Sequence, residues 1–559
     1  MSCELPETQS QLGYTRITSS KTRLIHVCIF SSNIVLRTPN LTASSPSYRR
    51  RSSIFIDGIH DVKDDNASMM APAQLYSTMS GRLFHCGRIA IVLVGLPARG
   101  KTVLHGKYRH ISVSLSRYLQ WLGVKTRVFH LGDYRRATLG ENQDVPEDYF
   151  YIDPSPSSLN LRDKIVKKCR EDLYTWLNNE NGQVAIYDAV NPHSEGRRSL
   201  ALEFAKNEVQ TIFIESYVTD RSILAENARS VKINSPDFKG MNADEAAQLY
   251  LRRIDMKIPH FQTMNEKDLN YIKMINAGQS IQYNNVSFGY LSYRIVFYLM
   301  NLHIKSRAIY FARAGPSDDE NSYKSDDSLG DDGVYYSQKM TNTLLAYIKN
   351  QNAQDSKAEN STEKLLTVWT SDSKNSYETA IPLEEEGFKV RQRSQLSQIN
   401  PGVCENLNES SIRKLYPDEI EKHEADPYHH RYPRAESYHD LAVRLEPIIL
   451  ELEREENDLL IIAHESVLRV LYGYLMACDA MLIPALYFPR DQIIEIVPSS
   501  YQNEARIIKI PDLKSNDTSN EIIPAPIPII LCPAGNDSPT ELSNQSINFH
   551  TEEHPLSLD

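Results

Sequence analysis

The chain has 559 residues, of which 41% are apolar, and it carries a formal net charge of −11 at pH 7. The length predicts two or three folded domains, because a single hydrophobic core seldom organises so long a chain. The apolar fraction excludes a wholly disordered protein. The negative balance excludes a global attraction to nucleic acid, so local basic groups must hold any anionic ligand.

The N-terminal segment, residues 1–85, is rich in serine and shows no sustained hydrophobic period, so we expect a disordered tail. Between Glu7 and Asp57 its basic residues have no acidic counterparts. That composition fits a basic tail or a transit peptide, and we prefer the tail. Ser53 lies downstream of two arginines, as basophilic protein kinases prefer, and is a candidate regulatory phosphorylation site. A chance match in a basic tail is an equally good interpretation.

Order is predicted to begin at residues 88–94, a near-continuous apolar run of strand length. Such a run is typical of a central parallel strand that is buried on both faces. Further strands and helices are predicted in alternation: strands at 126–131, 184–187 and 211–215, and helices at 161–177 and 198–205. This alternation predicts an α/β domain with a parallel sheet over residues 86–305.

A second α/β domain is predicted over residues 306–512. Its apolar runs are at 308–312, 365–369 and 459–464. Two excursions interrupt the domain, a very acidic one at 318–332 and a polar one at 350–364. The last residues, 513–559, are rich in Ser, Pro and Asn, which predicts a second disordered tail.

A phosphate-binding motif follows the first predicted strand. The residues Gly95-Leu-Pro-Ala-Arg-Gly100-Lys101-Thr102 fit the pattern GxxxxGK(S/T) between a strand and a helical pattern. The glycines let backbone N–H groups close around phosphates, and the helix N-terminus adds positive potential. Lys101 would reach the β- and γ-phosphates and Thr102 would hold Mg²⁺. The motif predicts a nucleoside triphosphate as ligand but does not specify the reaction.

An aspartate ends the strand predicted at 184–187. From this position the Asp188 carboxylate could hold Mg²⁺ or accept the substrate's proton, and the alternative is a carboxylate that only caps the next turn. Basic residues cluster in the same part of the chain: Arg135, Arg136, Arg162, Arg197, Arg198, Lys232, Arg252 and Arg253. A sugar phosphate needs fixed guanidinium forks of this kind, although each residue alone is more often a solvated surface charge.

The order of several sequence blocks carries a family resemblance. These are Gly95–Thr102, Arg117–Trp121, Gly132–Arg136, Asp188–Asn191, Phe213–Ser216, Val231–Asp237 and Tyr298–Asn301. Together they resemble 6-phosphofructo-2-kinase/fructose-2,6-bisphosphatase over residues 86–512. The resemblance implies a P-loop kinase domain followed by a histidine-phosphatase (phosphoglycerate-mutase-like) domain. It also implies transfer of the ATP γ-phosphate to fructose 6-phosphate and a cytoplasmic location. A homodimer is a possible assembly.

The resemblance also implies roles for single residues. Asp188 and Lys101 match the catalytic positions, and Thr102 and Asp188 match the Mg²⁺ site. Asn227 and Lys232 match nucleotide-side positions. The implied fructose 6-phosphate contacts are Arg135, Arg162, Arg253 and either Arg197 or Arg198, because Gly196 looks like an extra residue beside that pair. Val190 stands where the family often has threonine. Residues 103–109 look like additional sequence after Thr102, and could disturb the phosphate loop.

The second domain departs from the family at its nucleophile. The family's first phosphatase strand ends in Arg-His-Gly, whereas this chain has Arg313-Ala314-Gly315. A methyl group cannot form a covalent phosphoenzyme, so we expect no bisphosphatase turnover. Other positions of the implied site are retained: Glu405, Tyr416, Arg431, His464 and Arg469. Glu465 replaces a glutamine and so adds negative charge where a phosphate would lie.

Three functions remain in competition. The first is the 6-phosphofructo-2-kinase, which would control glycolysis and gluconeogenesis through fructose 2,6-bisphosphate. The second is another small-molecule P-loop kinase, against which the arginine set argues. The third is a catalytically inactive regulatory protein that binds ATP or a sugar phosphate. The seven cysteines are scattered singly, which favours a reduced compartment. The sequence contains no run of eighteen apolar residues, so we expect no membrane span.

Overall fold

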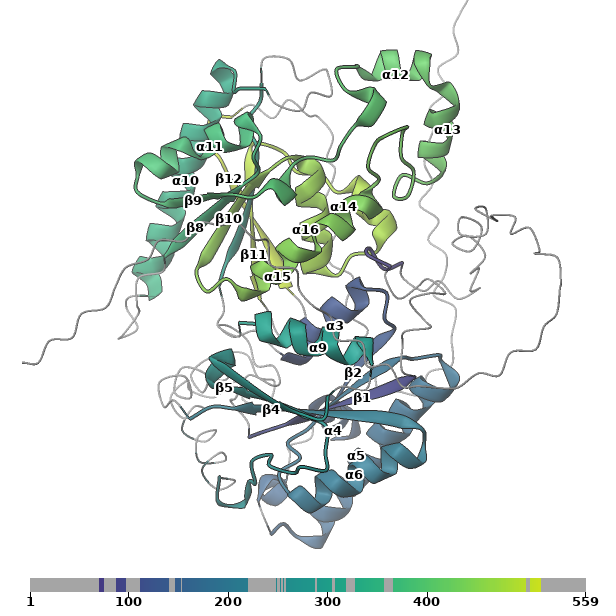
Figure 1. Cartoon of the computed structure of the whole chain (residues 1–559). Helices are drawn as coiled ribbons and strands as arrows, with labels where there is room; N and C mark the ends of the chain where they lie inside the picture. Colours follow the sequence, from purple (N-terminus) through teal and green to yellow (C-terminus); the bar gives the residue numbers. More distant parts are fainter. Residues whose placement is uncertain are drawn as a thin grey trace, which may run out of the picture. The chain divides into compact units, whose positions relative to one another are not determined.

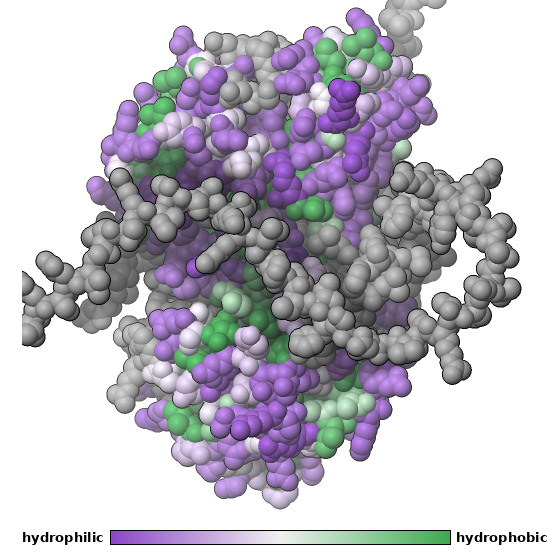
Figure 2. All heavy atoms as spheres, in the orientation of Figure 1, coloured by the Kyte–Doolittle hydropathy of each residue, from purple (hydrophilic) through white to green (hydrophobic). Residues whose placement is uncertain are grey.

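The computed structural model describes residues 70–74, 87–96, 111–139, 146–151, 153–219, 248, 252, 255, 258–286, 289–303, 307–317, 327–355, 365–498 and 503–513. Within them lie two six-stranded sheets with helices on their faces (Figure 1). The expected α/β class is confirmed. Hydrophilic residues predominate on the face of the molecule shown in Figure 2. No helix in the described ranges is long and apolar enough to cross a membrane.

The first sheet has the strand order β2-β3-β1-β4-β5-β6. The strands are β1 (Arg88–Val94), β2 (Thr126–His130), β3 (Val184–Asp188), β4 (Val209–Tyr217), β5 (Tyr271–Ile275) and β6 (Ser280–Asn284). The first five are parallel, and β6 pairs with β5 in the antiparallel sense. The carboxyl ends of β1, β2 and β3 therefore meet at one edge, where α/β proteins bind ligands.

The central strand β1 is buried on both faces. Ile89, Ile91 and Leu93 enter one hydrophobic cluster, while Ala90 and Val92 enter another, because successive side chains of a strand point to opposite faces. The helices of this domain are α3 (Ile111–Trp121), α4 (Leu131–Leu139), α5 (Pro156–Asn179), α6 (Ser194–Lys206) and α9 (Tyr290–Asn301), with short 3₁₀ turns η1 (Glu147–Phe150), η3 (Ile258–His260) and η4 (Asn276–Gly278). Helices α3 and α9 cover one face, and α5 and α6 the other (Figure 1).

Two expected helices are longer than predicted. Helix α5 begins at Pro156, five positions before the predicted start at 161, with Ser155 as its N-cap. The Ser155 hydroxyl accepts a hydrogen bond from the Ser158 N–H, and proline suits the first helical position because no intrahelical donor is needed there. Helix α6 begins at Ser194 and contains the predicted helix at 198–205.

The second sheet has the order β12-β11-β7-β10-β8-β9. The strands are β7 (Ile309–Arg313), β8 (Leu366–Thr370), β9 (Lys389–Gln392), β10 (Asp458–Ala463), β11 (Gln492–Pro498) and β12 (Asn503–Lys509). Strands β7 to β10 are mutually parallel, and β11 and β12 are antiparallel additions. The helices are α10 (Asp331–Asp355), α11 (Lys374–Glu385), α12 (Glu409–Leu415), α13 (Pro417–Ala425), α14 (Tyr438–Arg444), α15 (Glu446–Arg454) and α16 (Glu465–Met476), with 3₁₀ turns η5 (Ser394–Leu396), η6 (Gly402–Cys404) and η7 (Ala480–Ala485).

Helix α10 includes the end of the expected acidic excursion at 318–332 and the start of the expected polar excursion at 350–364. Asp331 and Asp332, assigned to the acidic excursion, form its first turn, where carboxylates interact favourably with the helix dipole. The helix then continues to Asp355, so the polar residues from 350 to 355 are helical although they present no apolar stripe. The earlier turns of α10 anchor the helix, because Tyr336, Met340 and Leu344 are buried in a hydrophobic cluster.

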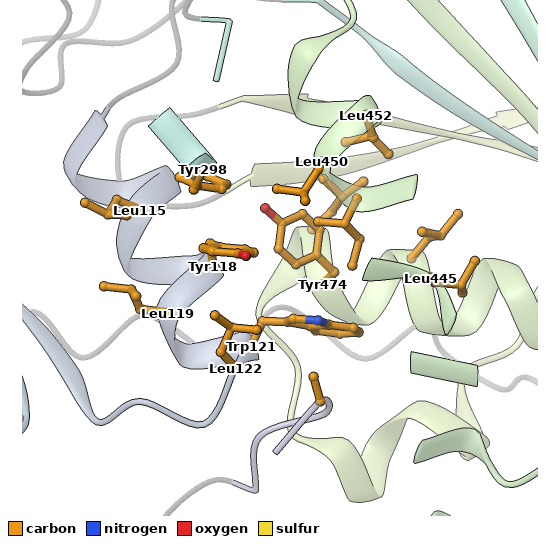
Figure 3. Close-up of a cluster of buried hydrophobic side chains, with 14 of the residues drawn as sticks. Leu115, Tyr118, Leu119, Trp121, Leu122, Tyr298, Leu445, Leu450, Leu452 and Tyr474 are labelled. Atoms are coloured by element: carbon orange, nitrogen blue, oxygen red, sulfur yellow. The ribbon is translucent and has the colours of Figure 1, made fainter. Parts of the chain in front are cut away.

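Helices of the two domains share one hydrophobic cluster. Tyr118 of α3 stacks on Tyr298 of α9 with ring centroids 4.3 Å apart, and Trp121 meets Tyr474 of α16 edge-on at 5.5 Å (Figure 3). Beside the rings, the buried Arg117 Nη2 lies 3.0 Å from Glu453 Oε1 of α15. The packing of these helices therefore links α3 and α9 to α15 and α16.

A segment of the expected N-terminal tail is packed against both domains. Ala73 N–H donates to the carbonyl of Trp121 at 3.0 Å, and the Tyr428 hydroxyl donates to the carbonyl of Pro72 at 2.8 Å. Both Pro72 and Ala73 are buried. The expected disordered tail through residue 85 therefore needs a correction at residues 70–74, which contacts with distant residues hold in place.

Candidate active site

The carboxyl ends of β1 and β3 are joined by hydrogen bonds. Strand register places Leu93 opposite Asp188. The Asn191 side-chain amide donates to the Leu93 carbonyl at 2.8 Å, and the Gly95 N–H donates to the Val190 carbonyl at 3.1 Å. Gly95 has φ 138°, a value that suits glycine. These two hydrogen bonds hold the start of the phosphate loop against the loop that follows Asp188. Val190 contributes its backbone carbonyl to them and not its side chain.

Six predicted site residues lie outside the described part of the chain. They are Gly100, Lys101, Thr102, Asn227, Lys232 and Arg253. Ser53 and the additional residues 103–109 lie outside it as well. For the phosphate loop, the structure thus describes the strand that enters it, its first glycine and helix α3, which begins beyond it at Ile111.

Asp188 is 4% exposed and faces a histidine that no sequence motif marks. His130 Nδ1 lies 2.8 Å from Asp188 Oδ2, and His130 is itself 3% exposed at the end of β2. Burial alone would lower the pKa of His130, but the hydrogen bond and negative charge of Asp188 outweigh it and raise that pKa. Only its position in the sequence could have indicated His130, because it is the last residue of a strand that neighbours β3.

Arg135 and Arg162 meet on one aromatic ring. The guanidinium carbons lie 6.0 Å and 5.4 Å from the ring centroid of Tyr149, and Arg135 is also 5.1 Å from that of Phe150. Arg162 Nε donates to the Tyr149 carbonyl at 2.8 Å, which fixes the guanidinium beside η1. Two positive groups on one ring create a local positive potential, so this arrangement suits an anionic ligand.

The two adjacent arginines of α6 have different roles. Arg197 is 1% exposed, donates from Nε to Glu266 Oε1 at 2.8 Å, and donates from Nη1 to the Asn191 carbonyl at 3.0 Å. This guanidinium holds the loop after Asp188, and its contact with a sugar phosphate stays a prediction. Arg198 is exposed and bonds Asp268, with Nε to Oδ2 at 2.9 Å, and is the better candidate of the pair. Because 69 residues separate Arg197 from Glu266, no local sequence pattern indicates their contact.

A second site lies at the carboxyl ends of β7 and β10. Ala314 follows β7 and donates its N–H to the Ala463 carbonyl at 3.0 Å, so the residue that replaces the nucleophile lies beside the end of β10. His464 caps α16: its Nδ1 accepts the Ser466 N–H at 3.3 Å, which leaves the ring proton on Nε2. Burial and the charges of nearby arginines lower the pKa of His464 to about 3, so the ring is neutral.

Glu465 contacts two of the predicted phosphate-site arginines. Its Oε2 lies 3.3 Å from Arg313 Nη1, and its Oε1 lies 3.1 Å from Arg469 Nη2. The other retained positions are on separate elements. Glu405 follows η6, Tyr416 joins α12 to α13, and Arg431 Nη1 lies 3.6 Å from Asp440 Oδ2.

The fold and the first site define a P-loop kinase domain that is followed by a second α/β domain. A family model described as 6-phosphofructo-2-kinase matches residues 76–306, and one described as histidine phosphatase superfamily (branch 1) matches residues 342–509. A crystal structure of an alpha-ribazole phosphatase from Shigella flexneri matches at 15% identity, covering 36% of this chain and 96% of its own, with a TM-score of 0.30.

Relatives match most of the chain. A Saccharomyces cerevisiae protein provisionally named 6-phosphofructo-2-kinase/fructose-2,6-bisphosphatase is 41% identical over 82% of this chain and 90% of its own length. The 6-phosphofructo-2-kinase/fructose-2,6-bisphosphatase 3 of Rattus norvegicus is 38% identical over 74% of this chain and 70% of its own. Form 4 of Homo sapiens is 36% identical, with coverages of 74% and 82%. The chain belongs to the 6-phosphofructo-2-kinase/fructose-2,6-bisphosphatase family, which confirms the predicted resemblance.

Proposed function

We propose that this chain is a 6-phosphofructo-2-kinase that transfers the γ-phosphate of ATP to the 2-hydroxyl of fructose 6-phosphate. One observation carries the proposal: a buried carboxylate, Asp188, lies opposite Leu93 on the strand that leads into the phosphate-loop motif. Phosphoryl transfer needs aligned reactants and neutralised charge rather than a protein nucleophile, and these elements can supply both. The product, fructose 2,6-bisphosphate, would control glycolysis and gluconeogenesis.

The phosphate loop would bind the nucleotide. Gly95 and Gly100 let backbone N–H groups approach the phosphates, and Lys101 would contact the β- and γ-phosphates. Asn227 and Lys232 would lie on the nucleotide side. Mg²⁺, held by Thr102 and Asp188, would neutralise charge on the phosphates. These oxygen ligands are of the kind that Mg²⁺ prefers, and the burial of Asp188 fits such a role.

Asp188 would act on the acceptor hydroxyl. The carboxylate accepts or orients the proton of the 2-hydroxyl, and His130 fixes one of its oxygens. Arg135 and Arg162 would bind the anionic sugar phosphate beside Tyr149, with Arg198 and Arg253 as further contacts.

We propose that the bisphosphatase activity is absent. Ala314 lies where the covalent mechanism needs a histidine, and a methyl side chain offers no lone pair to attack phosphorus. His464 and Arg469 alone cannot form the phosphoenzyme. The test is release of inorganic phosphate from fructose 2,6-bisphosphate by the purified chain. We expect a rate at least about 10⁴-fold below that of an active family member, and a comparable rate would contradict the proposal.

We propose a homodimer through the edge of the first sheet. The edge strand β6 exposes Tyr283, and the outward side of α9 exposes Tyr290, Tyr293 and Phe297 at helical spacing. In the described part of the chain β6 pairs only with β5, and exposed aromatic side chains and an edge strand are both typical of an interface. Light scattering would measure the mass, and Tyr283→Glu should shift a dimer to monomer. A monomeric wild-type chain at micromolar concentration would contradict the proposal.

Two further expectations complete the proposal. The enzyme would act in the cytoplasm, and phosphorylation of Ser53 would regulate it. Fractionation of cells and a phosphopeptide map test these points, and a mitochondrial chain or an unmodified Ser53 in growing and starved cells would contradict them.

The competing function is a regulatory protein that binds ATP without turnover. Calorimetry of ATP binding, followed by a turnover assay of the same sample, separates the two. Binding with formation of fructose 2,6-bisphosphate supports the kinase, whereas binding without product supports the regulatory protein.

A further inference from the structure

Three arginines gather at the degenerate site of the second domain. Arg313 ends β7, Arg469 lies on α16, and Arg490 donates from Nε to the Ala314 carbonyl at 2.9 Å. All three are near enough to His464 to act on the charge of its ring. A group of guanidiniums around one point is the arrangement that binds phosphate oxygens in proteins.

The carboxylate of Glu465 bridges two of these arginines. One oxygen lies 3.3 Å from Arg313 Nη1, and the other lies 3.1 Å from Arg469 Nη2 and accepts the Phe488 N–H at 3.1 Å. The Glu465 side chain is 13% exposed, so the pairs are mostly shielded from water. These contacts, two guanidiniums and one backbone N–H, are those that two oxygens of a bound phosphate would receive.

We propose that Glu465 is a built-in counter-ion that occupies the anion position of the second domain and thereby excludes phosphate esters from it. A phosphate would have to displace the carboxylate from both arginines or share them with a like charge. Both alternatives are unfavourable in a site of low dielectric. Loss of the nucleophile and loss of anion binding are therefore two separate changes in this domain.

The carboxylate also stabilises the helix that joins the domain to its neighbour. Glu465 is the first residue of α16, where a negative charge interacts favourably with the helix dipole. Farther along α16, the Tyr474 hydroxyl bonds Glu453 and its ring packs on Trp121. The occupied anion position thus holds in place, without a ligand, a helix that packs against the kinase domain.

Phosphate binding to the full chain tests the proposal. Inorganic phosphate would be titrated into the wild type and Glu465→Gln by calorimetry. Glutamine keeps the size of the side chain and can still accept the Phe488 N–H, but it carries no charge. We expect the variant to gain one phosphate site, absent from the wild type or at least tenfold weaker there. Phosphate binding at the kinase site is common to both proteins and cancels in the comparison.

A matched variant controls for the general loss of a negative charge. Glu451→Gln removes a carboxylate that pairs with Arg393 at 2.9 Å on the exposed side of α15, and it should gain no phosphate site. Adding Arg469→Ala to Glu465→Gln should abolish the new site. The proposal is overturned if the folded Glu465→Gln chain gains no site, or if Glu451→Gln gains the same one.

A second variant, which keeps Glu465, remains decisive should Glu465→Gln not fold. Arg313→Ala in the otherwise unchanged chain should leave the phosphate isotherm as it is, because the wild-type arginine is already occupied by Glu465. Loss of a phosphate site in that variant would show that the position is open to anions, and would overturn the proposal.

Discussion

His130 Nδ1 and Asp188 Oδ2 lie 2.8 Å apart at the ends of adjacent strands, and both side chains are almost completely buried. Strand register alone places the two residues opposite each other. Because β3 neighbours both β1 and β2, the same backbone pairing brings the carboxylate to the phosphate-loop motif and gives it a fixed partner. We therefore assign His130 as a positioning residue for Asp188.

Replacement of His130 should lower turnover more than nucleotide binding. We expect His130→Ala to reduce kcat by about 10- to 100-fold, in the range seen when hydrogen-bond partners of metal-binding carboxylates are removed, with the KM for ATP little changed. His130→Asn can still donate a hydrogen bond and should recover part of the loss. Steady-state kinetics measures both values. An unchanged kcat in the folded alanine variant would rule out the positioning role.

Arg162 should determine affinity for the sugar phosphate. Removal of a charge-assisted contact costs about 1.5–3 kcal/mol, so Arg162→Ala should lower kcat/KM for fructose 6-phosphate by about 10- to 100-fold while the KM for ATP stays similar. Lys167→Ala is the matched control, since Lys167 is on the same helix with a side chain that is 79% exposed. Equal effects of the two variants would contradict the assignment.

The buried pair Arg117–Glu453 should be expensive to break. Its side chains are 5% and 0% exposed, and the Tyr474 ring lies 5.2 Å from the guanidinium carbon. Arg117→Met leaves Glu453 buried without its cation, so the free energy of unfolding should fall by about 3–5 kcal/mol. Urea denaturation measures this change.

A double variant and a surface control complete this test. Arg117→Met with Glu453→Leu removes both charges and should recover most of the loss. Arg413→Ala breaks an exposed pair with Glu409 and should change the free energy of unfolding little, because water screens that pair. A loss for Arg117→Met as small as that of Arg413→Ala would show that the pair contributes little.

His464 should make the protein less stable in acid. Its folded pKa of about 3 lies below the ordinary value of about 6.5, so between these values the unfolded chain binds the extra proton. The contribution to stability is complete above pH 6.5 and is lost as the pH falls towards 3. From pH 7.5 to 5.5, the wild type should lose stability that His464→Asn keeps, on the order of 1 kcal/mol. Parallel pH profiles of unfolding would contradict this expectation.

The sequence predicted the parts of the fold that depend on local patterns. The apolar run at 88–94 coincides with β1, since a strand that is buried on both faces needs no alternation of apolar and polar residues. The start of α5 was missed because its first turn, after Ser155, carries a cap and little apolar surface. The segment at 70–74 was missed because its order comes from partners such as Trp121 and Tyr428, far away in the sequence.

The candidate site was predictable where a motif names its residues. Asp188 was found from its place after an apolar strand, but its partner His130 required knowledge of strand order. Arg197 was indistinguishable from Arg198 in sequence, and only burial against Glu266 separates them. Similarly, Glu465 was recognisable as an added charge, whereas its bridge between Arg313 and Arg469 depends on the packing of α16 beside β7.

Formation of fructose 2,6-bisphosphate tests the central claim most directly. The full chain would be incubated with Mg-ATP and fructose 6-phosphate, and the acid-labile product would be assayed beside Lys101→Ala and Asp188→Asn. We predict product from the wild type and little or none from either variant. A silent wild type that stays silent after deletion of residues 103–109, or undiminished product from Lys101→Ala, would contradict the assignment of this chain as a 6-phosphofructo-2-kinase.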